Sequence, residues 1–139
     1  MFLQWRLNAG TMQRNKTQGK KYKETKNKEA KHKEKERKNK DMNASVAIQS
    51  LPAAENNEEL IRIVDEVIAY IKSTGYNYYV GPFETTIEGD YDELMDIVKE
   101  CQHIAVRAGA PSVAAYIKVS YKPEGDVLTI EKKVSKHHQ

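Results

Sequence analysis

Two segments of the sequence carry the start signal of an α-helix, and together they limit the fold more than any other feature. Asn56 is followed three residues later by Glu59, and Asp90 is followed in the same way by Glu93. This spacing is typical of a capping box, in which each side chain bonds the backbone N–H group of the other residue. Asn57 is an alternative cap for the first helix. We therefore expect two capped helices with a short non-helical stretch between them.

Apolar residues recur at helical spacing after each cap and mark one buried face on each helix. The two sets are Leu60, Ile63, Val64, Val67, Ile68 and Ile71, and then Leu94, Ile97, Val98, Cys101, Ile104, Ala105 and Ala108. Gly75 and Gly109 follow the two sets. A glycine in the left-handed conformation commonly ends a helix at this position, so each helix has a predicted end as well as a predicted start.

The segments around the helices have the β-branched, aromatic or alternating pattern of strands. They are Ser45–Leu51, Tyr76–Gly81, Phe83–Glu88 and Ser112–Tyr121, and a short last helix over Leu128–Lys136 would be capped by Thr129 or Asp126. Pro52 would end the first strand and Gly89 the third. The order β-α-β-β-α-β predicts an α+β, ferredoxin-like sandwich. Its four-stranded antiparallel sheet would carry two helices on one face, with the short C-terminal helix added.

The charge is divided unevenly along the chain. Residues 1–41 hold 14 basic and 5 acidic side chains, a net +9, whereas residues 42–139 hold 9 and 15, a net −6. The first part has few apolar residues, so burial cannot offset its ordering entropy of about 1–2 kcal/mol per residue. We expect residues 1–41 to be a disordered basic leader, or the product of a start codon assigned too early. Residues 42–139 are enough for one domain.

Several classes of protein are excluded by the composition. A single cysteine cannot form a disulfide framework, and no Cys/His spacing suits a zinc site. No apolar run approaches the roughly 20 residues that span a bilayer, and residues 1–12 lack a signal-peptide core, so we expect a cytoplasmic protein. Cys101 falls on the apolar stripe of its helix, and His103 cannot reach it from two residues away. No catalytic motif is present, and we predict that the protein is not an enzyme.

Two functional families share the predicted strand order but not the residues that they need. Acylphosphatases need an arginine-bearing anion site after the first strand, and here the segment Pro52–Glu55 carries a carboxylate instead. RNA-recognition motifs carry aromatic and basic residues on the third strand, and here Phe83–Glu88 holds two glutamates that would repel a phosphate backbone. Both functions are disfavoured.

The face of the sheet away from the two helices would be open, and strand alternation predicts which residues lie on it. The candidate ligand-binding residues are Gln49, Tyr79, Glu84, Thr86, Glu88 and Tyr116. Tyrosine rings could stack on a flat or cationic group, and carboxylates could pair with its charge or amino hydrogens. Phe83 is assigned to the opposite, buried side. The alternative is a face that is solvated or buried by dimerisation, without a ligand.

Three segments within about Asn43 to Lys136 are distinctive: SVAIQSLP, YVGPFETTIEGDYDELM and AGAPSVAAYIKVSYKP. The most specific piece is Thr85–Gly89 with the acidic capped helix that follows. Together these segments resemble the small thiamine-binding, YkoF-like proteins. The resemblance implies a ferredoxin-like protomer whose sheets associate into dimers and then tetramers. It also implies that the protein binds thiamine or its hydroxymethylpyrimidine part and catalyses no reaction.

The leading prediction is a non-enzymatic cytoplasmic protein that binds thiamine, or a related pyrimidine, in a homo-oligomer. It needs no cofactor, no metal and no membrane, and thiamine would be the ligand. One alternative is a structural or regulatory homo-oligomer without a small ligand. The other is a nucleic-acid-associated protein recruited by the basic leader, which is disfavoured because the leader has a single central aromatic residue, Tyr22, for stacking.

Overall fold

A computed structural model describes residues 19–29 and 42–138 of the chain. The chain divides into two compact units, residues 1–39 and residues 40–139, and each is described by itself. None of the described helices is long and apolar enough to cross a membrane.

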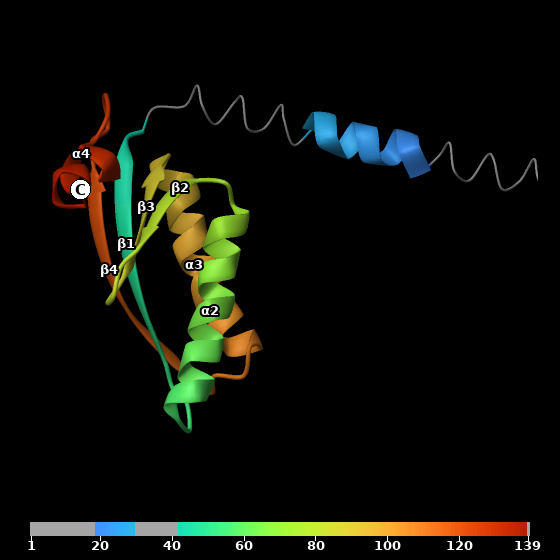
Figure 1. Cartoon of the computed structure of the whole chain (residues 1–139), viewed down its shortest axis with the longest axis vertical. Coiled ribbons are helices and arrows are strands. Elements are labelled where there is room, and N and C mark those ends of the chain that lie inside the picture. Colours follow the sequence, from blue (N-terminus) through green and yellow to red (C-terminus); the bar gives the residue numbers. More distant parts are fainter. Residues whose placement is uncertain (1–18, 30–41, 139) are drawn as a thin grey trace, which may run out of the picture. The chain divides into compact units, whose positions relative to one another are not determined.

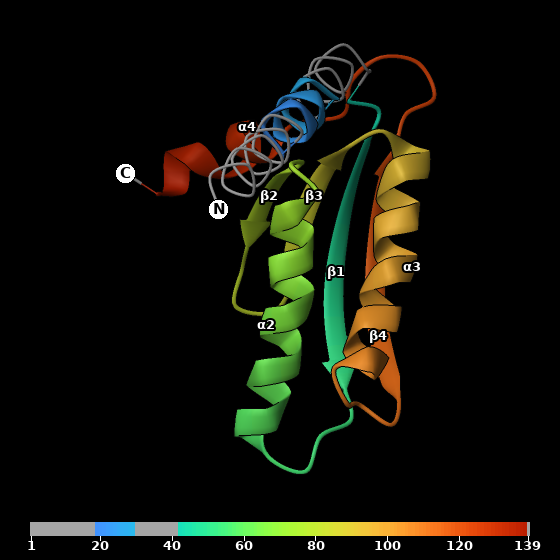
Figure 2. The same cartoon turned by 90° about the vertical axis from the view of Figure 1, so that its right-hand side faces the viewer.

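The larger unit has the predicted order of strands and helices (Figure 1). Its elements are β1 (Ala44–Pro52), α2 (Asn57–Ser73), β2 (Asn77–Val80), β3 (Thr85–Gly89), α3 (Tyr91–Arg107), β4 (Val113–Tyr121), α4 (Ile130–Val134) and the 3-10 turn η1 (Ser135–His137). The strands form an antiparallel sheet in the order β2-β3-β1-β4. Helices α2 and α3 both cover one face of this sheet (Figure 2). The predicted ferredoxin-like α+β fold is confirmed.

Both predicted helix caps are present. The side chain of Asn56 accepts a hydrogen bond from the backbone N–H of Glu59 at 2.9 Å, and that of Asp90 accepts one from Glu93 at 3.2 Å. Gly75 follows the first helix with a φ of 76°, in the left-handed region that glycine adopts without strain. The local residues therefore define these helix ends as the sequence predicted.

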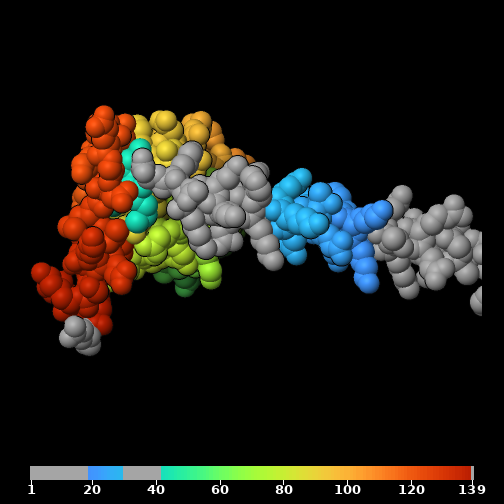
Figure 3. All heavy atoms as spheres, turned by 90° about the horizontal axis from the view of Figure 1, so that it is seen from above, coloured from blue at the N-terminus to red at the C-terminus, as the bar shows by residue number. Residues whose placement is uncertain are grey.

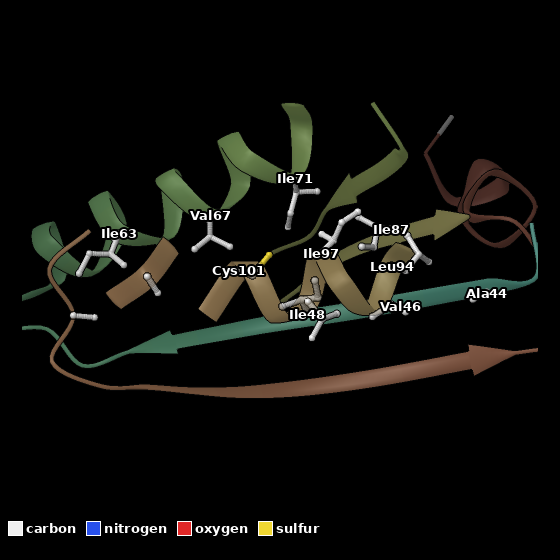
Figure 4. Close-up of a cluster of buried hydrophobic side chains, with 13 residues drawn as sticks. Ala44, Val46, Ile48, Ile63, Val67, Ile71, Ile87, Leu94, Ile97 and Cys101 are labelled. Atoms are coloured by element: carbon white, nitrogen blue, oxygen red, sulfur yellow. The ribbon is translucent and has the colours of Figure 1, made fainter. Parts of the chain in front are cut away.

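The core lies between the two long helices and the sheet (Figure 4). Its fully buried large side chains are Ile63, Ile71, Ile87, Leu94, Val46 and Cys101. Alternate residues of β1 point into this core, with Val46 at 0% and Ile48 at 3% exposure. The remaining residues of β1 thus fall on the other face of the sheet.

One prediction at the β2–β3 connection is wrong. Phe83 is 79% exposed and outside any strand, because Gly81 N–H donates to the Glu84 carbonyl at 2.9 Å and closes a tight turn. At the other end of β3, Gly89 is the last residue of the strand, as predicted, and it pairs with Ala44. A Cβ atom at Gly89 would lie 2.5 Å from Cε1 of the Tyr76 ring. Glycine is therefore also needed there for the close approach of the Tyr76 ring.

The C-terminal helix lies on the side of the sheet opposite to α2 and α3 (Figure 1). Viewed from above, the red C-terminal residues stand on the same side of the domain as β4, away from the gold of α3 (Figure 3). The helix is capped by the side chain of Thr129, which accepts from the N–H of Lys132 at 3.3 Å. It covers Ile130–Val134 and continues as a 3-10 turn, so it is shorter than predicted. The face expected to be open is thus partly covered.

The described part of the smaller unit, residues 19–29, is helical with all of its residues exposed. The Thr25 hydroxyl donates to the Lys21 carbonyl at 2.7 Å, and Lys26 Nζ lies 5.1 Å from the centre of the Tyr22 ring. The structure thus describes a helix in these residues, and the expected disorder of the leader stays a prediction. Lysine and glutamate are good helix formers. When they lie one turn apart, their opposite charges attract and stabilise a helix even without buried apolar surface. The rest of the predicted leader, 1–18 and 30–41, lies outside the described residues.

Candidate ligand-binding face

The sheet face away from α2 and α3, called the open face below, carries side chains in rows across the strands. Residues directly opposite each other in an antiparallel pair lie on the same face. Tyr79 lies opposite Thr86, Thr86 opposite Ala47, and Ala47 opposite Lys118. Two predicted ligand-binding residues, Tyr79 and Thr86, are therefore direct neighbours in the middle row.

The row on the C-terminal helix side contains a buried carboxylate. Glu88 lies opposite Asn77 on β2 and opposite Ser45 on β1. It is only 2% exposed. Its Oε1 accepts from Asn77 Nδ2 at 2.6 Å, and its Oε2 accepts from the backbone N–H of Ile130 at 2.7 Å. Both oxygens of Glu88 thus have partners within the protein, and α4 sits on one of them.

The row on the side away from the C-terminal helix holds the remaining predicted residues, which are Gln49, Glu84 and Tyr116. Gln49 lies opposite Tyr116, whose side chain is 65% exposed. Glu84 precedes β3, and its Oε1 lies 3.0 Å from Lys118 Nζ. This ion pair joins the residue before β3 to β4 and so spans the central strand β1. The alternation of the strands thus places all six predicted residues on one face.

A second contact with the C-terminal segment involves Tyr79. Its hydroxyl lies 3.1 Å from Nε2 of His138, and the centres of the two rings are 5.7 Å apart at a tilt of 46°. Tyr79 remains 37% exposed. The six residues are therefore in two environments. Glu88 and Tyr79 bond the C-terminal segment, whereas the row of Tyr116 lies away from it.

Sequence reasoning missed the residues that hold the site residues in place. Asn77, Ile130 and His138 bond Glu88 or Tyr79, and Lys118 neutralises Glu84. The position of Asn77 opposite Glu88 could have been found from the strand register. The contacts of Ile130 and His138 could not, because they depend on how the chain returns across the sheet after β4.

The helix side of the domain contains a separate hollow of about 680 Å³. It is lined by the β1–α2 loop, the first turns of α2 and the α3–β4 loop, at the Pro52 end of β1. None of the six predicted residues lines it. The residues around it, such as Glu59 bonded to Arg62 at 2.5 Å, are engaged in tying α2 to the end of α3.

The two side chains considered for catalysis, Cys101 and His103, have structural explanations. Cys101 is fully buried, and desolvation raises the pKa of its thiol to about 12, so almost no thiolate exists at neutral pH. His103 lies beside Glu100 on the helix surface, with Nδ1 3.3 Å from Oε2. Within the described residues, no group of three or more His, Cys, Asp or Glu side chains is placed to hold a metal ion.

The larger unit, which carries the open face, is similar to known proteins. The family described as thiamine-binding protein matches residues 46–138. A UPF0045 protein of Clostridium perfringens is 44% identical over 93 residues, which are 67% of this chain and 95% of the relative.

Solved structures are similar over the same extent. A domain of unknown function (DUF77) from Bacillus cereus has 36% identity and a TM-score of 0.62, covering 70% of this chain and 91% of that one. A Thermotoga maritima protein, proposed to act in thiamine biosynthesis or salvage, has 38% identity and a TM-score of 0.60, covering 68% and 97%. By the family match and by this identity, the chain belongs to the thiamine-binding protein family.

Proposed function

We propose that this protein binds thiamine, or its hydroxymethylpyrimidine part, on the open face and catalyses no reaction on it. The observation that carries the proposal is the gathering of two tyrosine rings, hydrogen-bonding groups and carboxylates on one sheet face of a thiamine-family fold. The proposal includes a cytoplasmic location and no nucleic-acid or membrane partner.

Thiamine joins a flat aminopyrimidine to a thiazolium that carries a permanent positive charge. Tyr116, being exposed, offers a ring face for stacking or for a cation, worth about 0.5–2 kcal/mol. Its row neighbour Gln49 can donate to and accept from the pyrimidine edge, as can the hydroxyl of Thr86. These side chains would hold the flat part of the ligand.

The two carboxylates would have different roles. Glu84 is partly exposed and already faces a cation, Lys118 Nζ, so a thiazolium could take the place of the ammonium. Glu88 is buried, and its Oε2 now accepts a hydrogen bond from Ile130 N–H. The exocyclic amine of the pyrimidine could donate a hydrogen bond to Glu88 only at this oxygen. Charge-assisted hydrogen bonds of this kind are worth about 1.5–3 kcal/mol.

We propose that a second copy of the chain covers the open face. Tyr116 at 65% exposure and Leu51 at 40% are large apolar side chains on this face, and Ala114 beside them is exposed too. Burial of such a patch favours association. The expected assembly is a dimer at least, and a tetramer by family resemblance. A monomeric mass in light scattering at micromolar concentration would contradict it.

Titration calorimetry of the full chain with thiamine tests the function. We expect Tyr116→Leu to weaken binding about threefold to thirtyfold, which corresponds to the loss of one ring contact at about 1.4 kcal/mol per decade. Tyr121→Leu is the matched control. Tyr121 lies on the same strand and is similarly exposed, at 50%, but faces the helix side and stacks on Tyr91. Equal affinities for the two variants would place the ligand elsewhere.

A ligand-free oligomer is the second candidate, and the internal bonding of Glu88 favours it. Both of its oxygens are satisfied without any ligand, so the carboxylate is explained as a structural tie. The same titration decides between the two functions. Absence of binding heat at millimolar thiamine, by a folded and oligomeric chain, would support the ligand-free assembly.

A further inference from the structure

The last described residues of the chain, 128–138, form a strap across one end of the open face. Its base is fixed next to β1, where Asp126 Oδ1 accepts from Met42 N–H at 3.0 Å and Val127 N–H donates to the Met42 carbonyl at 2.9 Å. Beyond this base the strap contains α4 and η1, and it lies opposite to α2 and α3 (Figure 1).

The strap meets the sheet at two of the proposed ligand-binding residues. The backbone N–H of Ile130 donates to Glu88 at 2.7 Å, and His138 Nε2 lies 3.1 Å from the Tyr79 hydroxyl. The first contact occupies the carboxylate oxygen proposed for the ligand amine, and the second holds Tyr79, one of the two proposed ring surfaces. With the strap in this position Glu88 is only 2% exposed, so a ligand cannot reach its carboxylate while the strap covers it.

The strap is held by few contacts. Ile130, 7% exposed, is its one buried residue, and Leu128 is 58% exposed. Its α-helix has five residues, far fewer than the roughly 12–15 at which an isolated helix becomes stable in water. A segment with so little buried surface opens more easily than the sheet beneath it.

We infer that the strap is an autoinhibitory lid, in which Ile130 N–H holds the oxygen of Glu88 that a ligand amine takes when the lid opens. The inference rests on the proposed function, since it names the regulation of that same site. The apparent Kd is then the intrinsic Kd divided by the fraction of molecules with the strap open. Any change that loosens the strap without touching the open face strengthens binding.

Hydrogen exchange of the full chain without ligand tests the opening itself. We expect the Ile130 amide to exchange at least a hundredfold faster than the amide of Val46 in the central strand, because the strap opens without global unfolding. Equal protection of the two amides would show that the strap is a fixed part of the fold, and would overturn the inference whether or not thiamine binds.

The same amide then reports on competition. We expect saturating thiamine to speed exchange at Ile130 further, because the ligand holds the strap open. Slower exchange would mean that the strap closes onto the ligand as part of the site, and unchanged exchange would mean that it is unrelated to the site. Either result overturns the inference.

Two strap variants and two controls complete the test by calorimetry. Ile130→Ala removes the buried anchor and His138→Ala removes the partner of Tyr79, and we expect each to strengthen thiamine binding about threefold to tenfold. Leu128→Ala and His137→Ala alter exposed side chains of the same segment and are expected to leave Kd unchanged. His138→Ala keeps the test valid if Ile130→Ala fails to fold.

The pattern of results separates this inference from the proposed function. If the parent binds thiamine and all four variants bind equally, the lid is wrong and the function stands. If neither the parent nor any variant binds, the proposed function is wrong, and with it the autoinhibitory role, even where exchange shows that the strap opens.

Discussion

Replacement of Glu88 by glutamine measures how strongly the buried carboxylate joins the strap to the sheet. The carboxylate accepts from Asn77 Nδ2 and from Ile130 N–H with separate oxygens. Glutamine keeps the shape but has one acceptor oxygen, and its other terminal group is an NH₂ donor. One of the two present donors would therefore lose its acceptor and face another donor.

The expected cost follows from this loss. A hydrogen bond to a charged group contributes about 1.5–3 kcal/mol, and leaving a buried donor unpaired costs about 1–3 kcal/mol. Because Glu88 is only 2% exposed, solvent does not screen the effect. The strap can release Ile130 N–H to water, which limits the loss to the free energy of strap closure. We expect Glu88→Gln to lower the unfolding free energy by about 1–3 kcal/mol. For a domain of this size, each kcal/mol lost lowers Tm by about 4–8 °C.

Thermal unfolding of the full chain, followed by circular dichroism, measures the change. Glu84→Gln is the matched control, since it removes the same charge from the same face. Its partner Lys118 is 72% exposed and Glu84 is 29% exposed, and surface ion pairs contribute about 0–1 kcal/mol. If the two variants melt at the same temperature, the carboxylate of Glu88 does not join the strap to the sheet and our reasoning is refuted.

Three further predictions concern the fold. Gly89→Ala should destabilise the domain by more than about 1 kcal/mol in urea unfolding, because its Cβ meets the Tyr76 ring at 2.5 Å; parental stability would mean that the ring moves freely. Asn56→Ala should cost about 1 kcal/mol through loss of the cap, whereas exposed Asn57→Ala should not, and equal losses would contradict the capping role. Cys101, with its pKa raised to about 12, should react with a thiol reagent at pH 8 only after unfolding; rapid reaction of the native protein would contradict its burial.

The local parts of the fold could be predicted from sequence because their causes are local. A cap at Asn56 or Asp90 is a contact between residues three apart, and it was found by spacing alone. The residues of the open face were found by the two-residue period of strands. That period held through β1, where Val46 is buried and Ala47 lies on the other side.

The parts that could not be predicted depend on contacts between distant residues. Phe83 was assigned to the core by extending the alternation of β3 backward, but the strand begins after it, at Thr85. The burial of Glu88 depends on Ile130, whose position is set by the path of the chain beyond β4. The Glu84–Lys118 pair requires the register of β3, β1 and β4 together. Such contacts have no local signature.

The central position of β1 in the sheet has a consequence for synthesis of the protein. β1 pairs with β3 on one side and with β4 on the other, and Ala44 lies opposite Tyr121. On the ribosome β1 emerges before the other three strands of this sheet, yet its second edge has no partner until nearly the whole domain has been translated. During that interval α2, α3 and the β2–β3 pair can form, but the unpaired edge of β1 is open to other chains. The nascent domain therefore keeps one strand edge open to association until β4 leaves the exit tunnel.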